Sequence, residues 1–481
     1  MRKFRFLLYL PVFLQGLVAQ TLPEKQLVLD QMKLANTYFT TKWPDPTKTI
    51  VTNKTRPSNL WTRGTYYEGL MQLYYLTQDA TLYKYAIDWG TFHQWQPTYT
   101  GNAPTRNADN QCCGQTYLEL YQIEPKPEKI ETIQNSIDAM VNSSKKDDWW
   151  WIDALHMAMP VFAKLGVINN DNKYYEKMYQ LYYHTKTSIK GVGLYNTSDS
   201  LWYRDSVYLP PKVTTHGLPV YWSRGNGWVF AALARTLDVI PLTAPHRDEY
   251  VTTFKQMAYK LIKLQRADGF WNCNLGDAND FGGKESSGTV FFTYGLAWGI
   301  NHNLLDSATF YPFVAKAWKG LVHDALHTDG SIGYMQSSGS KPADGQPLSY
   351  TKMPDFEDFG LGGFLLAGSE VYQLANDSKQ ATGIQNQSAT RHQLSVYPNP
   401  FSNTIRICFT PSSENSRLLI LNSHGQRVFS ITNGSSNSAD LTWDGKTSDG
   451  LSCPDGLYLV YLQNKERSLT KKIILKRQNT W

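Results

Sequence analysis

Cysteine is scarce in this chain, which argues against one common kind of metal site. The five cysteines among 481 residues are Cys112, Cys113, Cys273, Cys408 and Cys453. None of them has the paired CxxC spacing of zinc ribbons and fingers, so the sequence predicts no zinc centre of that kind. Cys408 and Cys453 are compatible with a disulfide or with two separate buried thiols, because free cysteine packs as a small apolar side chain.

Long apolar runs are missing after the first twenty residues. At the N-terminus, three basic residues precede an apolar run over 6–18, and Ala19 offers a cleavage point. The run is too short to cross a bilayer comfortably, so it predicts a signal peptide over 1–20 and export through the Sec pathway. The mature chain would begin near Thr21. No later run is long enough to cross a membrane, and we expect no membrane span.

An excess of charge of one sign is missing from most of the chain. Residues 1–20 carry three basic and no acidic residues, and residues 392–481 carry ten basic and six acidic ones. Residues 21–391 therefore have a net charge of −1, which argues against nucleic-acid binding. Aromatic residues are plentiful instead, with 15 Trp and 30 Tyr. Such rings stack on the apolar faces of sugars, and they also build large cores.

Helical periodicity alternates with Gly, Pro, Asn and Asp breaks through most of the chain. Twelve helices are predicted, over 24–40, 58–77, 80–96, 107–123, 128–142, 149–166, 171–188, 222–239, 245–266, 286–304, 307–326 and 359–376. Since no strand series separates them, six helical hairpins closed into a ring are expected, an all-α (α/α)6 barrel over 21–376. The apolar segment 149–166 suits an inner helix, and the amphipathic segments 171–188 and 245–266 suit outer ones.

Two long loops and a change of period complete the layout. The loops over 189–221 and 327–358 are rich in Gly, Pro, Ser and Asp, and we expect them to wall a binding cleft. Residues 377–391 are polar and without period, as in a linker. Beyond them, short strand-like runs stand at 405–409, 418–421, 426–431 and 457–462. They predict a separate all-β sandwich over 392–481.

One acid, Asp153, lies inside the apolar segment 149–166. At helical spacing it shares a face with His156, Met157 and Pro160. An acid on such a face must form an ion pair, line a cavity, or have its pKa raised by desolvation. A carboxyl group protonated near neutral pH is what a general acid requires. A structural acid that caps or pairs is the alternative, because such pairs also perturb pKa values.

Other acids, arginines and tryptophans stand near predicted helix N-termini. They belong to the segments 107–111 (NADNQ), 201–205 (LWYRD), 221–228 (YWSRGNGW) and 283–289 (GKESSGT). In an (α/α)6 barrel the N-termini of the inner helices gather at one end of the ring. These side chains would then converge on one pocket.

Taken singly, each of these residues also has a structural interpretation. Asp109 and Glu285 are compatible with helix caps, Arg224 with a structural ion pair, and Trp228 with the core. His216 fits an exposed loop better than a metal site, and no cluster of metal-binding residues is visible.

Together the motifs resemble a known family. Residues 150–160 (WWIDALHMAMP), 222–228 (WSRGNGW), 285–289 (ESSGT) and 292–301 (FTYGLAWGIN) look like those of the unsaturated rhamnogalacturonyl hydrolases, relatives of the unsaturated glucuronyl hydrolases. The resemblance extends over about residues 25–376. It implies a glycoside hydrolase that removes the 4,5-unsaturated uronic acid from the non-reducing end of lyase-generated oligosaccharides, such as rhamnogalacturonan fragments. Hydration of the C4=C5 double bond would start the reaction, with no metal or organic cofactor.

The resemblance also implies roles for particular residues. Asp153 would protonate C4, with Asp109 as its carboxylate partner. Arg224 and Trp228 lie four residues apart, on one helix face, and would hold the uronate carboxylate and stack on its ring. The further candidates for substrate binding are Trp222, Arg204, His216 and Trp61. Some family members carry a His where this chain has Arg204, so that role does not transfer; Arg204 offers a second cation toward the carboxylate.

The C-terminal segment resembles a different family. Residues 397–401 (YPNPF), 455–458 (DGLY) and 470–473 (TKKI) look like the C-terminal sorting domain of the type IX secretion system of Bacteroidetes. This implies the type IX machinery as a partner and a secreted or surface-attached protein. A carbohydrate-binding sandwich is the alternative for this segment.

Two other functions are compatible with the helical part of the sequence. One is an inverting exo-glycosidase on a saturated sugar, which needs an acid and a base about 6.5–9.5 Å apart. The other is a surface glycan-binding protein without catalysis. The place of Asp153 in an apolar predicted helix argues against the second, since binding alone gives no reason to bury an acid.

Overall fold

The structure is a computed structural model in which the chain forms two compact units, Met1–Gln380 and Ala381–Trp481. It describes residues 21–51, 55–98, 101, 103–352, 354, 358–376, 394–397, 399, 401–409, 416–422, 426–433, 439–463 and 468–477. The predicted signal peptide over 1–20 and the predicted linker over 377–391 lie outside these residues.

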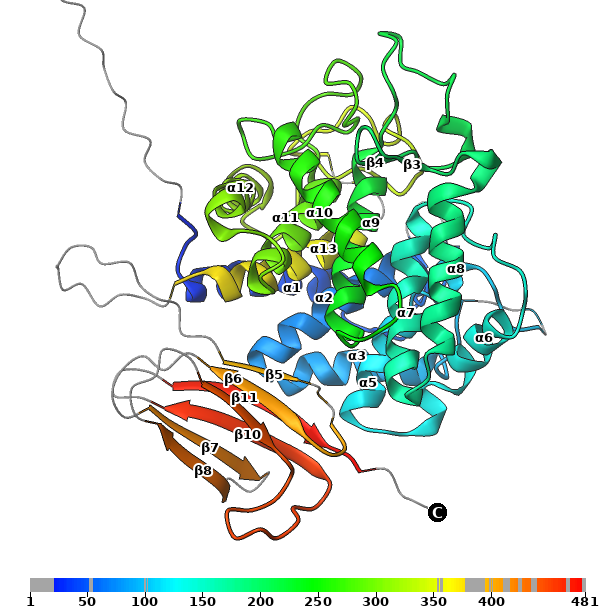
Figure 1. Cartoon of the computed structure of the whole chain (residues 1–481). Coiled ribbons are helices and arrows are strands. Elements are labelled where there is room, and N and C mark those ends of the chain that lie inside the picture. Colours follow the sequence, from blue (N-terminus) through cyan, green and yellow to red (C-terminus); the bar gives the residue numbers. More distant parts are fainter. Residues whose placement is uncertain are drawn as a thin grey trace, which may run out of the picture. The chain divides into compact units, whose positions relative to one another are not determined.

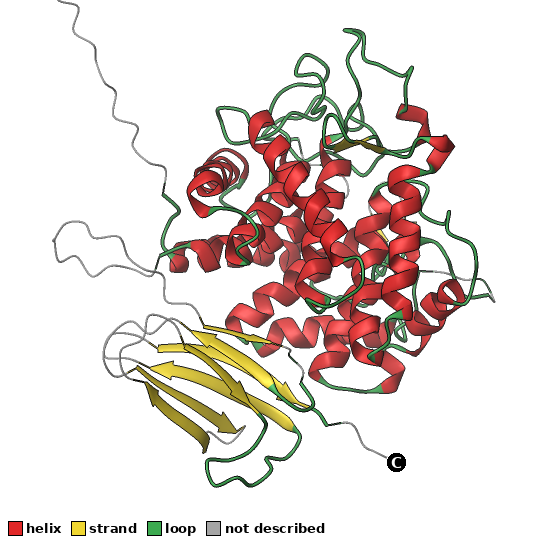
Figure 2. Cartoon of the chain, in the orientation of Figure 1, coloured by secondary structure: helices red, strands yellow, loops and turns green. Residues whose placement is uncertain are grey.

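The first unit is built from helices, drawn red in Figure 2. They are α1 (Lys25–Lys42), α2 (Trp61–Thr77), α3 (Ala80–Phe92), α4 (Ala108–Gln111), α5 (Gly114–Ile123), α6 (Glu131–Val141), α7 (Asp153–Asn169), α8 (Lys173–Thr187), α9 (Ser223–Val239), α10 (Arg247–Leu264), α11 (Ser286–Asn301), α12 (Ser307–Gly320) and α13 (Asp358–Leu374). Each of the twelve predicted helices has a counterpart. The predicted helix over 107–123 is divided into α4 and α5 at Cys112 and Cys113.

Six helices contact one another in a closed order. α2 packs against α5, α5 against α7, α7 against α9, α9 against α11, α11 against α13, and α13 against α2 (Figure 1). On the outside, α1 packs on α13, α3 on α2, α8 on α7, α10 on α9 and α12 on α11, while α6 contacts α8. Residues 153–166 of α7 are all buried, whereas α10 buries one side only, as their apolar patterns predicted.

Glycine allows two helices of this closed order to approach closely. A Cβ at Gly69 of α2 would lie 2.4 Å from the carbonyl oxygen of Gly362 on α13. A Cβ at Gly362 would in turn lie 2.2 Å from the carbonyl oxygen of Thr65. Neither distance is tolerable for a carbon atom, so the contact between α2 and α13 depends on both glycines.

The interior holds a buried ionic network. Nε2 of His156 on α7 lies 2.9 Å from Oε2 of Glu68 on α2, and Nε of Arg235 on α9 lies 3.4 Å from the same oxygen. Arg235 also donates to Glu119 of α5 at 3.2 Å, and Glu119 accepts from Lys164 of α7. Because buried charges need partners, this network fixes α2, α5, α7 and α9 relative to one another.

Two short antiparallel strand pairs, which the sequence pattern did not predict, interrupt the helices. They are β1 (Ile50–Val51) with β2 (Thr55–Arg56), and β3 (Tyr195–Asn196) with β4 (Leu201–Trp202). The second pair lies within the long loop over 189–221. It stabilises that loop immediately before Arg204.

The second unit contains two antiparallel sheets. Their strands are β5 (Leu394–Tyr397), β6 (Ile405–Phe409), β7 (Ser416–Asn422), β8 (Arg427–Asn433), β9 (Ala439–Trp443), β10 (Gly456–Gln463) and β11 (Ser468–Leu475). One sheet has the order β11-β10-β7-β8 and the other β5-β6-β9. Apolar side chains of both sheets, such as Ile407 and Val460, form one core. The four predicted strand runs correspond to β6, β7, β8 and β10, while β5, β9 and β11 were not predicted.

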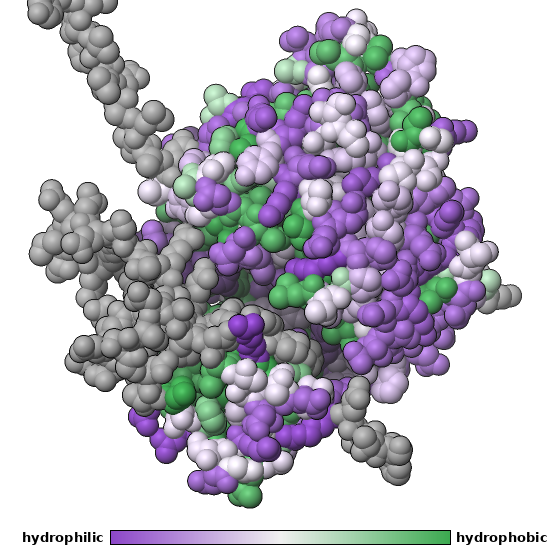
Figure 3. All heavy atoms as spheres, viewed as in Figure 1, coloured by the Kyte–Doolittle hydropathy of each residue, from purple (hydrophilic) through white to green (hydrophobic). Residues whose placement is uncertain are grey.

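The structure also bears on membrane helices, on the outer surface and on one of the two C-terminal cysteines. None of the described helices combines the length and apolar character needed to cross a membrane. Hydrophilic residues cover much of the face around α6 and α8 in Figure 3, as expected for outer helices. Cys453 is a buried free thiol, which favours a packed thiol over a disulfide at this position.

Candidate active site

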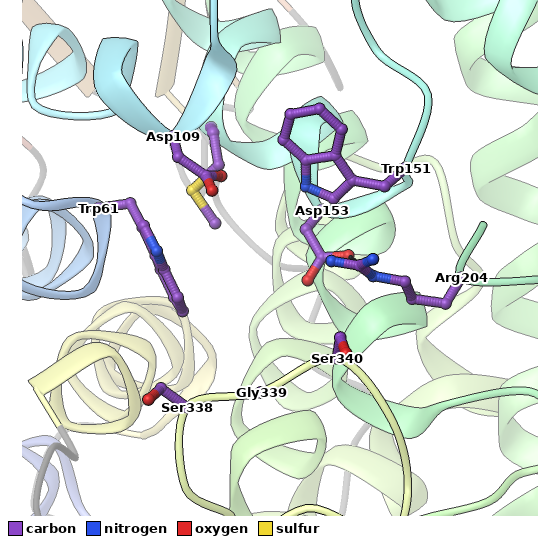
Figure 4. A pocket seen from close by; sticks show the side chains of 9 residues that line it. Trp61, Asp109, Trp151, Asp153, Arg204, Ser338, Gly339 and Ser340 are labelled. Atoms are coloured by element: carbon purple, nitrogen blue, oxygen red, sulfur yellow. Dashed lines mark hydrogen bonds and ion pairs between the residues drawn. The ribbon is translucent and has the colours of Figure 1, made fainter. Parts of the chain in front are cut away.

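A cavity of about 340 Å³ opens in the helical unit. Its lining residues are Trp61, Asp109, Trp151, Asp153, Met157, Arg204, Ser338, Gly339 and Ser340. Trp61 and Asp153 are the first residues of α2 and α7, and Asp109 lies in α4, just before α5. Of the segments predicted to converge on one pocket, those with Asp109, Asp153 and Arg204 do so, and Trp61 joins them from the start of α2. Both long loops contribute to its wall, through Arg204 and through residues 338–340 (Figure 4).

Asp153 lies at the N-terminus of α7, where it is buried except for 7 % of its surface. Its Oδ2 accepts a hydrogen bond from Nε of Arg204 at 3.2 Å. Burial raises the pKa of Asp153 above its usual value, and the positive charges of Arg204 and then Arg224 oppose this shift. The residue is thus desolvated, paired and open to the cavity at once.

Asp109 is the second acid of the cavity. The side chain of Asn107 caps α4 by accepting the N–H of Asp109 at 2.8 Å, which fixes the backbone at this position. Asp109 is therefore not the cap itself. Burial, followed by the negative charge of Asp153, raises the pKa of Asp109 to about 7. Two acids that share one cavity in this way do not both ionise easily, so the site retains a proton near neutral pH.

Arg204 is the cation among the residues that line the cavity. It comes from the loop after β4, which is tied to the start of α7: Ile152 donates its N–H to the Arg204 carbonyl at 3.0 Å, and Trp151 forms a β-bridge with Asp205. Nη1 of Arg204 donates to Oδ2 of Asp205 at 2.7 Å. Within the described part of the chain, Nη2 has no hydrogen-bond partner.

Aromatic and apolar side chains form the rest of the wall. In Figure 4, Trp61 faces Asp153 and Arg204 across the cavity, and Trp151 lies beside Asp153. Trp61 packs against two further rings, Trp228 at 6.0 Å between ring centroids and Phe359 at 5.7 Å. A carboxyl pair, a guanidinium and flat apolar rings suit an anionic sugar ring.

Arg224, which was expected to bind a uronate, does not line the cavity. Its guanidinium is fully buried, where Nη1 donates to the Gln336 carbonyl at 3.1 Å and Nη2 to the Ser337 carbonyl at 2.8 Å. A third hydrogen bond reaches Ser287 Oγ at 3.2 Å. Arg224 thus holds the loop that leads directly into residues 338–340 of the wall.

The other expected substrate-binding residues of this region also lie away from the cavity. Trp228 is fully buried, with its ring centroid 4.3 Å from that of Phe291, and it belongs to the core. Trp222 is buried at the start of α9, where its Nε1 donates to Gln336 at 2.8 Å. His216 is exposed on its loop, and its Nδ1 lies 2.7 Å from Oδ2 of Asp277. Glu285 caps α11 by accepting the N–H groups of Ser287 and Gly288, one of the two functions considered for it.

Five lining residues were not among the sequence candidates: Trp151, Met157, Ser338, Gly339 and Ser340. For Trp151 and Met157, the spacing from Asp153 in the sequence could have indicated a place in the cavity wall. Trp151 precedes Asp153 by two residues, and Met157 follows it by four, on the same helix face. Residues 338–340 have no chemical signature, and only their position in the predicted loop wall pointed to them.

Comparison with known proteins decides the family. Residues 32–375 match the model of Glycosyl Hydrolase Family 88. The chain belongs to this family. It is therefore an enzyme that hydrolyses glycosidic bonds, and the alternative of a binding protein without catalysis is wrong.

Relatives of this family 88 hydrolase come from several bacteria. It is 34 % identical over 335 residues to an unsaturated 3S-rhamnoglycuronyl hydrolase of Formosa agariphila, covering 65 % of this chain and 84 % of that one. A protein of the same name from Alteromonas sp. is 35 % identical over 223 residues, which cover 46 % of this chain and 51 % of that one. Among solved structures, a family 88 glycosyl hydrolase from Bacteroides vulgatus superposes with a TM-score of 0.67 at 34 % identity, covering 73 % of this chain and 99 % of that one.

The second unit of the hydrolase has its own family. Residues 395–476 match the model of the secretion system C-terminal sorting domain. This confirms the predicted sorting domain of the type IX system. It indicates that the hydrolase is exported, either into the medium or to the cell surface.

Proposed function

We propose that this hydrolase removes a 4,5-unsaturated uronic acid from the non-reducing end of oligosaccharides released by polysaccharide lyases. The observation that carries the proposal is the convergence of Asp109, Asp153 and Arg204 on one cavity of a family 88 chain. The cavity volume of about 340 Å³ suits one sugar ring held at a chain end. The names of the relatives point to the same class of substrate.

The architecture that we propose is an (α/α)6 barrel over residues 21–376. It is supported by the closed order of α2, α5, α7, α9, α11 and α13 and by the outer helices packed on them. Residues 1–20 would be a signal peptide read by the Sec pathway, 377–391 a linker, and 392–481 the sorting domain. In this division the catalytic residues all belong to the barrel.

Asp153 is proposed as the general acid and Asp109 as its carboxylate partner. Asp153 transfers its proton to C4 of the double bond, and positive charge develops at C5 and the ring oxygen. Water then adds to C5 and gives its proton to the Asp109 carboxylate. The resulting hemiketal opens to a ketone at C5, and the exposed hemiacetal at C1 releases the remaining oligosaccharide as an alcohol.

Arg204 would bind the carboxylate of the unsaturated uronic acid through Nη2. In the free site Arg204 stabilises the ionised form of Asp153, which is the wrong form for a general acid. A substrate carboxylate next to Arg204 adds a negative charge and competes for the guanidinium. Binding would therefore raise the proton affinity of Asp153 at the moment when the proton is needed.

The preferred substrate is proposed to carry rhamnose directly after the uronic acid. Relatives at 34 % and 35 % identity are named unsaturated 3S-rhamnoglycuronyl hydrolases, and rhamnogalacturonan fragments also join a uronic acid to rhamnose. Unsaturated residues derived from galacturonyl and from glucuronyl units are both candidates; because C4 belongs to the double bond, the two differ only in their anomeric linkage.

An inverting exo-glycosidase on a saturated sugar is the second candidate, because a pair of acids in one cavity also suits that reaction. In it, the acid protonates the glycosidic oxygen instead of C4. The two functions therefore differ in the atom that receives the first proton.

The deciding experiment uses lyase-digested and undigested rhamnose-containing polysaccharides with the purified enzyme in deuterated water. We expect loss of the alkene absorbance, release of a shortened oligosaccharide and one deuterium on C4 of the product. Cleavage of a saturated chain end, with no deuterium on carbon, would instead support the exo-glycosidase.

A further inference from the structure

Trp150 stands out among the three consecutive tryptophans that precede α7. Trp149 and Trp151 are buried, with 0 % and 4 % of their surfaces exposed, whereas Trp150 exposes 56 %. Exposed apolar side chains are common on proteins and need no function by themselves. Trp150 differs because its ring contacts two residues that line the catalytic cavity.

The first contact is with Trp151, whose ring centroid lies 4.6 Å from that of Trp150. The second is with Arg204, whose guanidinium carbon lies 6.0 Å from the centroid of the Trp150 ring. Trp150 is not itself among the residues that line the cavity. It therefore lies next to the cavity wall, on the side of Trp151 and Arg204.

The backbone around Trp150 is fixed on both sides. The carbonyl of Trp149 accepts a hydrogen bond from Thr185 Oγ1, and Trp151 forms the β-bridge with Asp205. With its backbone fixed, Trp150 has only two side-chain torsions that binding can restrict. It therefore loses little conformational entropy when a flat partner binds to its ring. Val207, two residues beyond the bridge partner, is also exposed, at 70 % of its surface.

We propose that Trp150 is the stacking platform of a second subsite, which binds the sugar immediately after the unsaturated uronic acid. This inference rests on the proposed function. With the uronate against Arg204, the next ring of the chain has to leave the cavity past its wall. Trp150 presents there a large apolar surface that suits the face of a pyranose, and a 6-deoxy sugar such as rhamnose adds an apolar methyl group.

The test compares two substrates that share the reacting sugar. One is an unsaturated uronic acid linked to rhamnose, and the other is the methyl glycoside of the same uronic acid. KM and kcat are measured for the full chain, for Trp150→Ala and for Trp150→Phe. Tyr259→Ala is the matched control, because Tyr259 on α10 is 49 % exposed and lies outside the cavity wall.

We expect Trp150→Ala to lower kcat/KM for the disaccharide about tenfold more than for the methyl glycoside, mainly through KM, as expected for the loss of ~1.4 kcal/mol of binding. Trp150→Phe should lower kcat/KM for the disaccharide less than Trp150→Ala does. Tyr259→Ala should leave kcat/KM unchanged for both substrates. Equal losses on both substrates, or no loss, would overturn the subsite and leave the proposed function intact. If the wild-type enzyme cleaves neither compound, the proposed function fails and the subsite fails with it.

Discussion

Nε of Arg204 lies 3.2 Å from Oδ2 of Asp153, so the proposed general acid is paired with the cation that would bind the substrate. The pair brings together two segments that are 51 residues apart in the sequence. It also links binding to proton transfer, because any anion that approaches Arg204 changes the charge that Asp153 experiences.

Asp153→Asn should abolish most activity without unfolding the protein. The amide has nearly the same shape and can still accept the hydrogen bond from Arg204. Because positioned general-acid catalysis contributes on the order of 10²–10⁴-fold, kcat should fall by about that factor while KM changes little. Steady-state kinetics and circular dichroism check this. A variant that keeps more than about a tenth of kcat, well above that expectation, would make Asp109 the next candidate for the acid.

Arg204→Gln should change both KM and the pH profile. KM should rise because the uronate loses the cation that binds it. Arg204→Lys should restore only part of the lost affinity, since lysine lacks the planar fork of the guanidinium. Removing the positive charge also raises the pKa of Asp153, so the basic limb of kcat against pH should move to higher pH. A purely structural role would lower activity at every pH and leave the limb in place.

Asp109→Asn should make the protein more stable at high pH. Folding raises the pKa of Asp109 to about 7, so its ionisation is unfavourable in the folded state. Wild-type stability should therefore fall as pH rises from about 4 to 7, and the variant should lack this part of the decline. Thermal melts at pH 8 should show a Tm higher by at least roughly 2–4 °C, the shift that about 1 kcal/mol gives in a large domain, with little difference at pH 4. A variant less stable than the wild type at pH 8 would contradict the assigned environment.

Arg224→Lys should lower stability as well as activity. A lysine cannot donate at once to the carbonyls of Gln336 and Ser337 and to Ser287, so buried acceptors lose their partners. Tm should drop, and KM should rise because residues 338–340 follow directly in the cavity wall. If Arg224 bound the substrate directly, the variant would have a higher KM and an unchanged Tm. Melting curves measured together with the kinetics distinguish this role from the structural one.

A truncated chain of residues 21–376 should fold and keep its activity. All residues that line the cavity belong to the helical unit, and the sorting domain has its own apolar core. Full-length and truncated proteins should have equal kcat/KM on one substrate, whereas only the full-length chain should cross the outer membrane in a type IX host. A truncated protein that folds but is inactive would show that the sorting domain contributes to the site.

Local signals in the sequence were sufficient to predict the helices and part of the candidate site. Periodicity predicted α7 as a buried helix because the segment carries apolar residues on every face. Asp153 reaches the cavity for a local reason, since it is the first residue of α7. Trp61 follows the same rule as the first residue of α2, whereas Asp109 lies in the short helix α4 just before α5. In the proposed barrel, a side chain at the start of an inner helix would point to one end of the ring, whatever the details of packing.

Only the tertiary structure decided which cation faces the cavity. Arg224 and Trp228 share a helix face with proper spacing, but α9 packs that region against α11 and against the loop at Gln336, which leaves both residues buried. Arg204 reaches Asp153 because Trp151 and Asp205 form a bridge between segments that are far apart in the sequence. Residues 338–340 line the cavity because their loop is held by Arg224. Such contacts depend on how distant segments pack, and periodicity within one helix contains no information about them.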